Sequence, residues 1–514
     1  MARLHEYQGK ALLRDAQIPI PRGGPANSPK EAKAVAEEIG DSVVVKAQAW
    51  VTGRAGLGAI RFADTPEQAF QAADDILGTK IDGFSVDTVL VEERLEIERE
   101  FFASVIIDDQ AQAPLIIFSR IGGTGIEQIV QEHPDAVARR TIDIRSALLD
   151  HQARDLVRKT DLHGKLQLKL ATLLVRLYAV AHRYDARVAE INPLALTTDG
   201  ELVAVDCRIT LDDYAVYRHP ELGIEIAREF DRPPTPLERI AWEVEKNDYR
   251  GTFYFIQLKE EFKSGEGVIG FHGAGGGGSM MSMDAVLNQG YTLANYVDTS
   301  GNPPASKVYR AARIILAQKG IDGYFASGSG VASQEQFHSA RGLVKAFLEV
   351  PLTVPAIIRL GGNAEERAIE ILARATEAIP APVEGYGKDN APEFCAERLN
   401  ELIKAHKPRN DEPPGRTKPE PQEPYRFETV TGGMVTLDHS VCKECATKFC
   451  VESCVPQILE LKDDVPVLNI SLEQAKKGGC TECLACDIEC YFEGERGGFV
   501  ALPIPGLDEL AFIS

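Results

Sequence analysis

The chain has 514 residues, of which 44% are hydrophobic and 26% charged, and its formal net charge is −21. This length allows about three domains with separate cores, and the negative field disfavours nucleic acids and anionic membrane surfaces as partners. The sequence contains neither a run of about 18 apolar residues nor the apolar core of a secretory signal, so we expect a cytoplasmic protein that acts on small molecules or other proteins.

The first 235 residues are expected to form an α/β domain. Apolar residues recur at helical spacing from Leu4 to Leu12, which predicts an amphipathic helix near the N-terminus. The segment 187–209 is typical of a β-hairpin, with its turn at Thr198–Asp199–Gly200. Between these two features the pattern predicts buried strands over 42–50, 88–93 and 100–108 and a long helix over 165–183.

From residue 236 the pattern changes to strands that alternate with helices. Three units repeat the order strand, glycine-bearing loop and helix, over residues 267–290, 323–349 and 355–375. Repeated units of this kind indicate an open parallel sheet that binds its ligands at the carboxyl ends of the strands. We therefore predict a second α/β domain over residues 236–405.

A linker is predicted over residues 406–427, followed by a third domain over 428–514. Residues 406–424 hold six prolines and almost no apolar side chain. A segment of this composition is extended and could span roughly 50 Å.

Eight of the ten cysteines lie between residues 442 and 490. A local group of cysteines in a long chain is typical of metal binding. The two runs, C-x2-C-x4-C-x3-C and C-x2-C-x2-C-x3-C, follow the spacing of a two-cluster bacterial ferredoxin, in which the fourth cysteine of each run binds the other cluster. The spacing predicts one [4Fe–4S] cluster on Cys442, Cys445, Cys450 and Cys490, and another on Cys454, Cys480, Cys483 and Cys486. Two structural zinc sites are the alternative, although zinc modules usually pair two C-x2-C knuckles across a longer gap.

The cysteine-rich tail also resembles the small ferredoxin-like proteins that accompany electron-transfer-flavoprotein:quinone oxidoreductases. The segments GGCTECLACDIEC (478–490) and RGGFVALP (496–503) carry this resemblance. It implies an electron donor or acceptor with a flavoprotein or another redox protein as its partner.

A lysine at a strand end could form part of a phosphate site. Lys46 ends an apolar strand, and the loop after it contains Gly53 and Arg54. A strand-end lysine beside a flexible glycine loop can clamp phosphates. The alternative is that the Lys46 side chain simply extends from the strand end into solvent.

The predicted hairpin offers a stronger nucleotide signal. A three-residue loop pairs position 197 with 201, which places Asn192 opposite Asp206 and Glu190 opposite Arg208 on the same face. An amide oxygen beside a carboxylate suits magnesium, which prefers a few hard oxygen ligands and retains waters or phosphates. The alternative is an ordinary hairpin with polar residues at its edge.

Residues 1 to about 400 resemble the β subunit of succinyl-CoA synthetase and its ATP-grasp relatives, including malate–CoA ligase and ATP-citrate lyase. Four segments carry this resemblance in the family's order: LHEYQGKALL, VVVKAQAWVTGRAGLG, AEINPLALTTDGELVAVD and FHGAGGGGSMMSMD. The resemblance implies an ADP-forming acid–thiol ligase with an ATP-grasp domain over 1–235 and a flavodoxin-like CoA-ligase domain over 236–405, here followed by an α+β ferredoxin-like domain. It also implies a partner α subunit, in an α2β2 assembly, that carries the phosphorylated histidine and the CoA site.

The same resemblance assigns roles to individual residues. It places Lys46, Gly53 and Arg54 at the ATP phosphates, Glu92 and Glu100 near the adenosine, Asn192 and Asp206 on magnesium, and Glu190 opposite the phosphohistidine. The loop Gly328–Ser329–Gly330–Val331 is expected to open a helix whose N-terminal dipole receives the phosphoryl group or the acid.

In this family ATP phosphorylates the histidine, the phosphoryl group passes to a carboxylate, and CoA then displaces it. His272 lies where the family usually has asparagine, which suggests contact with the acid, with a packing role as the alternative. Ala55 and Gly56 replace a Gly-Lys pair, and Ser329 replaces a glycine. The replacements at Ala55 and Gly56 are expected to remove one phosphate contact, and those at Ser329 and His272 favour an acid other than succinate.

Two functional hypotheses follow from the sequence. In the first, the chain is a ligase β subunit with ATP, Mg²⁺ and CoA as its ligands, and the attached clusters, mobile on the long linker, pass electrons to an oxidoreductase. Sensing of the redox state and stabilisation of a docking surface are the alternative roles of the clusters. In the second, the chain is an electron-transfer subunit whose ligase half mainly docks partner proteins.

Overall fold

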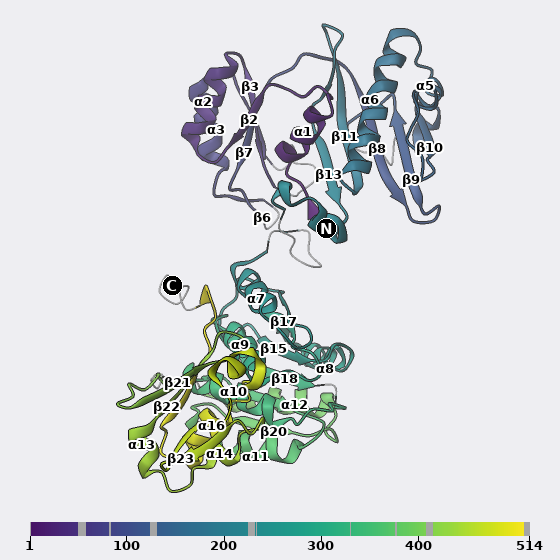
Figure 1. Ribbon diagram of the computed structural model, residues 1–514. Helices are drawn as coiled ribbons and strands as arrows, with labels where there is room; N and C mark the ends of the chain where they lie inside the picture. Colours follow the sequence, from purple (N-terminus) through teal and green to yellow (C-terminus); the bar gives the residue numbers. More distant parts are fainter. Residues whose placement is uncertain are drawn as a thin grey trace. The chain divides into compact units, whose positions relative to one another are not determined.

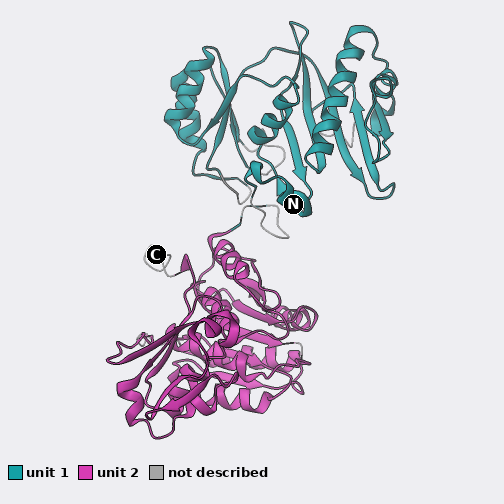
Figure 2. Ribbon diagram, viewed as in Figure 1, with its two compact units in different colours: residues 1–234 teal, residues 235–514 magenta. Residues whose placement is uncertain are grey.

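The computed structural model describes residues 2–49, 58–81, 84–123, 131–224, 232, 234–328, 330–375, 378–407 and 415–507. The chain divides into two compact units, residues 1–234 and 235–514 (Figure 2). None of the helices in these described ranges is long and apolar enough to cross a membrane.

A large antiparallel sheet and its helices form the main part of the first unit (Figure 1). The helix α6 (Gly164–Arg183) buries Leu170, Leu173, Leu174 and Leu177, which confirms the predicted apolar face. Two shorter helices, α1 (Glu6–Asp15) and α5 (Asp150–Arg158), lie in the same helical layer and contact α6. The strands, in sheet order, are β1 (Ala2–Arg3), β13 (Cys207–Leu211), β11 (Ala186–Thr197), β8 (Ile97–Asp108), β9 (Ala113–Ser119) and β10 (Val137–Thr141), with β12 (Leu202–Ala204) paired to β11.

A smaller four-stranded sheet in the first unit is covered by two helices. Both helices begin at a hydroxyl cap: Ser28 accepts from the N–H of Glu31, and Thr65 accepts from the N–H of Gln68. Apolar side chains from the sheet and from both helices form one core. The elements are β2 (Gly23–Ala26), β7 (Val89–Glu93), β3 (Val43–Ala47) and β4 (Ile60–Ala63), with α2 (Pro29–Ile39) and α3 (Pro66–Ile76); a short separate pair is β5 (Lys80–Ile81) with β6 (Phe84–Ser85).

The register of the predicted hairpin is confirmed. The N–H of Thr197 donates to the carbonyl of Glu201 at 2.9 Å, so the loop is the expected three-residue turn. Glu190 pairs with Arg208, and the N–H of Asn192 donates to the carbonyl of Asp206 at 3.1 Å. The hairpin therefore places Asn192 and Asp206 next to each other.

The second unit contains the predicted open sheet with helices on both faces. The strands β15, β18, β19 and β20 run parallel, and β14 is antiparallel to its neighbour β17 at one edge. One face packs against α8 and α12 and the other against α9, α10 and α11. The strands, in sheet order, are β14 (Tyr254–Gln257), β17 (Asn295–Asp298), β15 (Val268–Ala274), β18 (Gly323–Gly328), β19 (Ala356–Arg359) and β20 (Val383–Tyr386), with β16 (Thr292–Leu293) beside β15; the helices are α7 (Pro236–Lys246), α8 (Gly276–Asn288), α9 (Ala305–Leu316), α10 (Phe337–Glu349), α11 (Glu365–Ala375) and α12 (Pro392–Ala405).

The cysteine-rich tail is a small α+β structure in the same unit. Its three-stranded sheet begins at residue 424, inside the segment that was predicted to be linker. Its elements are β21 (Pro424–Glu428), β22 (Met434–Asp438) and β25 (Gly498–Ala501), the hairpin β23 (Leu459–Lys462) and β24 (Val465–Leu468), and the helices α13 (His439–Glu444), α14 (Phe449–Glu452), α15 (Leu472–Gln474) and α16 (Ala485–Glu493).

The tail is packed onto helices α9 and α10, so the expectation of a mobile carrier is wrong. Ile488 and Val500 of the tail share one hydrophobic core with Phe347 of α10. The predicted linker is also held near its middle, because the N–H of Arg416 donates to the carbonyl of Leu348 at 2.8 Å. Burial of a shared apolar core favours one rigid arrangement over a tethered one.

Candidate functional site

In the first unit, Lys46 lies in a buried network of charged side chains. Its Nζ is 2.8 Å from Oε1 of Glu6, 2.9 Å from Oε2 of Glu92 and 2.8 Å from the carbonyl of Val205. Lys10 contacts the same three groups, at 2.8, 2.6 and 2.7 Å. Lys46 is 5% exposed. The structure therefore rejects the interpretation that this lysine extends into solvent.

The network keeps Lys46 charged. Burial alone would lower the pKa of its ammonium group, but the nearby carboxylates of Glu6 and Glu92, with a further contribution from Asp206, outweigh burial and raise the pKa. The ammonium group is thus a permanent cation beside the residue predicted to hold magnesium. The carboxylate of Glu92 forms ion pairs with Lys10 and Lys46. Its predicted contact with adenosine stays a prediction.

The side chain of Asn192 connects the hairpin to the backbone of Gly123. Its Oδ1 accepts from the N–H of Gly123 at 2.9 Å, and its Nδ2 donates to the carbonyl of Gly123 at 3.1 Å. An amide oxygen has two lone pairs, so Oδ1 retains one acceptor site. Asn192 and Asp206 together thus offer hard oxygens of the kind that magnesium prefers.

Not every predicted nucleotide residue is placed by the structure. Glu100 is an exposed residue of β8, and its role near adenosine stays a prediction, as does the role of Glu190 on β11. Gly53 and Arg54, together with the replacements Ala55 and Gly56, lie outside the described residues.

In the second unit, the predicted acid or phosphoryl loop follows strand β18. Arg359 fixes this loop with its whole guanidinium group: Nη1 donates to the carbonyl of Gly328 at 3.1 Å, Nη2 to that of Lys388 at 3.2 Å and Nε to that of Asn390 at 2.6 Å. Gly330 has a φ of +78°, a conformation that glycine adopts readily. Sequence reasoning missed Arg359, which appears there only as one residue of an apolar strand.

One expectation about this loop needs correction. The helix α10 begins at Phe337, so residues 328–331 do not open it directly, because a further loop segment separates them. Val331 is 83% exposed, and Ser329 lies outside the described residues.

His272 is a buried residue in the centre of the parallel sheet. It is 3% exposed, and its Nδ1 is 2.7 Å from the hydroxyl of Tyr324. Burial lowers the pKa of His272 to about 3, so the ring is neutral at physiological pH. This environment provides a packing role, and a direct contact with an acid stays a prediction.

The cysteines of the tail influence one another electrostatically within two sets of four. Burial, followed by the charges of Cys490 and Cys445, raises the pKa of Cys442 to about 12. Burial and the same two cysteines also raise the pKa of Cys450 to about 12. These neighbours show that Cys490, from the second run, lies among the cysteines of the first run.

The second set shows the converse exchange. Burial is the main cause that raises the pKa of Cys480 to about 12, and Cys483 and Cys454 add to it. A pocket is lined by Cys454, Cys480, Cys483 and Cys486 together with apolar residues of the tail. Thus Cys454, from the first run, lies among the cysteines of the second.

The surroundings of the thiols suit an iron–sulfur group. The N–H of Gly498 donates to Sγ of Cys490 at 3.2 Å, and hydrogen bonds to sulfur are among the features that tune such clusters. In the described part of the chain, however, no group of three or more His, Cys, Asp or Glu side chains is arranged to hold a metal ion. The clusters therefore stay a prediction.

Comparison with known proteins decides the family. A model described as an ATP-grasp domain matches residues 3–196, and one described as ATP citrate lyase citrate-binding matches residues 257–396. The β subunit of the GDP-forming succinate–CoA ligase of Thermus thermophilus is 38% identical over 369 residues, which cover 72% of this chain and 93% of the relative. The chain belongs to the succinate–CoA ligase β-subunit family.

Other members of this family of acid–thiol ligases give the same result. The β subunit of the ADP-forming succinate–CoA ligase of Roseiflexus sp. is 37% identical over 381 residues, which cover 74% of this chain and 95% of that subunit. In fold, the chain is similar to ATP citrate lyase of Methanothrix soehngenii, solved with citrate and coenzyme A, with a TM-score of 0.59 and 18% identity over 78% of this chain and 99% of that one. Residues 397–514 lie outside both matched domain models.

Sequence reasoning did not select two residues of the Lys46 network. Glu6 and Lys10 lie in the segment LHEYQGKALL, which carries part of the family resemblance. Their spacing of four residues places both on one face of α1, and both are buried despite their charge. The signal that could have identified them in the sequence is a glutamate and a lysine, four residues apart, on the buried side of an amphipathic helix.

Proposed function

We propose that this chain is the β subunit of an ATP-dependent, ADP-forming carboxylate–CoA ligase that acts with a separate α subunit. The proposed reaction phosphorylates a histidine of that α subunit, transfers the phosphoryl group to a carboxylate and releases the acyl group to CoA. The observation that supports this most strongly is the pairing of Asn192 with Asp206 in the hairpin, close to the buried ammonium of Lys46.

Each of the site residues has a separate role in the proposed reaction. Lys46 supplies positive charge for the phosphates, and Glu190 orients the phosphohistidine loop of the α subunit. Asn192 and Asp206 would hold Mg²⁺, which when bound neutralises the charge that develops on the transferred phosphoryl group. Arg359 positions the loop at Gly328 and Gly330, where the acid or its phosphate is received.

The acid and the nucleotide are open to direct test. Relatives are named as ADP-forming or GDP-forming succinate–CoA ligases. Succinate and ATP are therefore the first substrates to assay, and the replacements at His272 and Ser329 make a different carboxylic acid the second.

The tail is proposed to hold two [4Fe–4S] clusters and to transfer electrons to or from a redox partner such as a flavoprotein. This part of the proposal is supported by the two sets of four neighbouring thiols, one completed by Cys490 and the other by Cys454. The alternative is an electron-transfer subunit in which the ligase half is a docking scaffold.

The substitution Asp206→Ala distinguishes these proposals. We expect it to abolish magnesium-dependent phosphorylation of the α subunit while the iron content of the chain stays unchanged. Asp199→Ala is the matched control, because Asp199 lies in the turn of the same hairpin and accepts a hydrogen bond from the Thr197 hydroxyl. Normal phosphorylation by Asp206→Ala would refute the magnesium site, and loss of activity in both variants would point to a damaged hairpin.

A further inference from the structure

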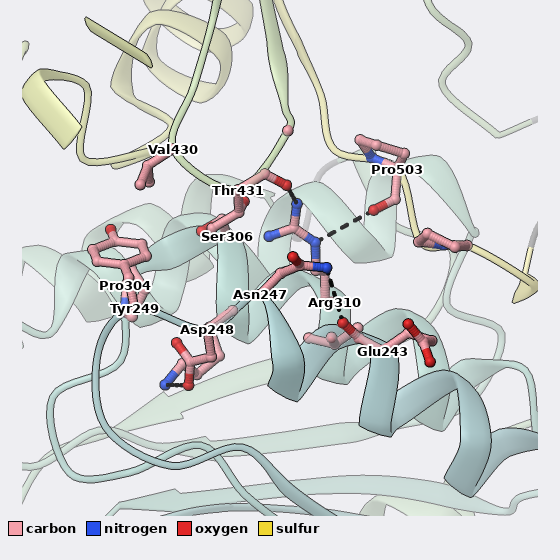
Figure 3. Close-up of a pocket in the computed structure, with 14 residues that line it drawn as sticks. Glu243, Asn247, Asp248, Tyr249, Pro304, Ser306, Arg310, Val430, Thr431 and Pro503 are labelled. Atoms are coloured by element: carbon pink, nitrogen blue, oxygen red, sulfur yellow. Dashed lines mark hydrogen bonds and ion pairs between the residues drawn. The ribbon is translucent and has the colours of Figure 1, made fainter. Parts of the chain in front are cut away.

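A pocket of about 320 Å³ lies in the second unit, between the ligase domain and the cysteine-rich tail. Helices α7 and α9 form one side, and the tail contributes the turn at residues 430–432 and two prolines near its end (Figure 3). This volume is in the range of sites that bind small molecules. The walls combine apolar residues with several polar and charged side chains, among them Asp248, Lys307 and Arg310.

Arg310 is the most unusual residue of this pocket. It is 5% exposed, yet its contacts are all long: Nε is 3.4 Å from the carbonyl of Pro503, Nη2 is 3.4 Å from that of Thr431, and Nη1 is 3.8 Å from Oε2 of Glu482. Charge-assisted hydrogen bonds usually measure about 2.7–2.9 Å. A buried guanidinium group with only distant acceptors is costly unless an anion completes its environment.

Two cations of the neighbouring helix α10 that face the tail have close partners. Lys345 is 2.6 Å from Asp487, and Arg341 is 2.8 Å from Glu489. The loose contacts of Arg310 are therefore a local feature of the pocket and not a general property of how the tail packs.

The first turn of α9 lies at the same pocket. This helix has 12 residues and begins at Ala305, so its N-terminal dipole favours an anion. Ser306, in this turn, is 1% exposed, and its hydroxyl has no hydrogen-bond partner among the described residues although it lies at the pocket wall. Ser306 and Arg310 are four residues apart and so share one face of the helix.

The acidic residues at the pocket already have partners. Asp248 is paired with Lys307 at 2.5 Å, and Glu243 is paired with Lys246. Glu482, beyond the turn, accepts from the N–H of Thr431 at 3.1 Å and from its hydroxyl at 2.7 Å. Glu482 therefore has close partners of its own, and its carboxylate stays 3.8 Å from the guanidinium group of Arg310.

We propose that this pocket binds a small anion with a carboxylate or phosphate group, held by Arg310, the Ser306 hydroxyl and the first turn of α9. The bound anion bridges the ligase domain and the tail, because its other neighbours are residues 430–432. Glu482 connects this turn to the segment between Cys480 and Cys483, so the anion would stabilise the tail in its docked position.

Hydrogen–deuterium exchange on the full chain, with inorganic phosphate or succinate as the probe, tests the proposal locally. We expect an anion to slow exchange at residues 305–310 and 430–432. Slowing by phosphate alone identifies a phosphate ligand, and slowing by succinate alone identifies a carboxylate ligand. Because the readout is assigned to peptides, binding of either probe at the ligase active site does not interfere.

Two variants and a control complete the test. Arg310→Gln should remove the protection, and Ser306→Ala, which is mild enough to preserve the fold, should weaken binding about tenfold because one hydrogen bond to a charged group is lost. Arg313→Gln, on the same helix but paired with Glu349, should bind as the wild type does. The proposal is overturned if neither probe protects these residues, or if Ser306→Ala and Arg310→Gln are protected as fully as the wild type.

Discussion

Lys345 on α10 and Asp487 on α16 form an ion pair with an Nζ–Oδ2 distance of 2.6 Å, and neither side chain has any exposed surface. Asp487 also contacts Arg416, within the predicted linker, at 2.6 Å. The acid lies directly after Cys486, so the cysteine segment is tied to the ligase domain at one of its proposed ligands. The tail is thus an integral part of the second unit.

Removing one partner of this pair should be strongly destabilising. Lys345→Met leaves Asp487 buried with Arg416 as its remaining cation, and breaking such a pair typically costs about 3–5 kcal/mol. We expect a lower free energy of unfolding of the full chain and faster proteolysis at the linker. Lys477→Met is the control, since Lys477 and Glu473 form an exposed pair worth less than about 1 kcal/mol. Equal effects of the two substitutions would contradict a buried docking contact.

The exchange of the fourth cysteine between the two sets predicts a specific alkylation pattern. Cys454→Ser should expose Cys480 and Cys483 to alkylation and halve the iron content, while Cys442 and Cys445 stay protected. The buried Cys395, outside both sets, provides a neutral Cys→Ser control. Mass spectrometry of the alkylated peptides measures the outcome. Alkylation of Cys442 and Cys445 in the Cys454→Ser variant would show instead that each run holds its own cluster.

The buried His272 predicts a pH dependence of stability. Its pKa is about 3 in the folded chain, against a usual value of 6.5, because burial disfavours the charged ring. Below pH 6.5 the unfolded chain binds a proton that the folded chain does not. The unfolding free energy should therefore fall by up to about 1.4 kcal/mol per pH unit as the pH drops from 6.5 towards 3.

The substitution His272→Asn, which introduces the residue usual in the family, tests this prediction. An asparagine does not titrate, so calorimetry of the full chain should show a shallower loss of stability on acidification from neutral pH. At neutral pH the change should be small if the introduced amide retains a hydrogen bond to Tyr324. Parallel pH profiles for the two proteins would show that His272 is not buried as a neutral ring.

Arg359 should control the geometry of the proposed acid loop. Arg359→Lys keeps the charge but loses the planar fork that contacts three carbonyl groups, including that of Gly328. Because small displacements of a reacting group are costly, we expect roughly a ten- to hundredfold fall in kcat for acyl-CoA formation. Arg398→Lys, which alters a half-buried pair with Glu384, should leave kcat unchanged. A normal kcat for Arg359→Lys would remove the loop from the reaction.

Much of the fold could be predicted from local sequence. Periodic apolar residues located α6, and the three-residue turn fixed the hairpin register that brings Asn192 to Asp206. These features depend on neighbours in the chain, and their signals are therefore visible without tertiary information.

The contacts that join distant segments could not be predicted in the same way. Nothing local to Asp487 shows that its partner is Lys345, and the proline-rich composition of the linker suggested a tether although Arg416 anchors it. Likewise, the carboxylate of Glu6 reaches Lys46 only after α1 packs beside β3. Such pairs depend on the packing of whole elements, which propensity and spacing do not encode.

The most direct test of the ligase proposal is a phosphorylation assay on the chain purified anaerobically with its associated α subunit. ATP labelled at the γ-phosphate is added with magnesium, and acid-labile phosphohistidine is measured on each chain. The account predicts label on a histidine of the α subunit, lost in Asp206→Ala. Absence of label from both chains would contradict it and favour an electron-transfer subunit whose ligase half serves as a scaffold.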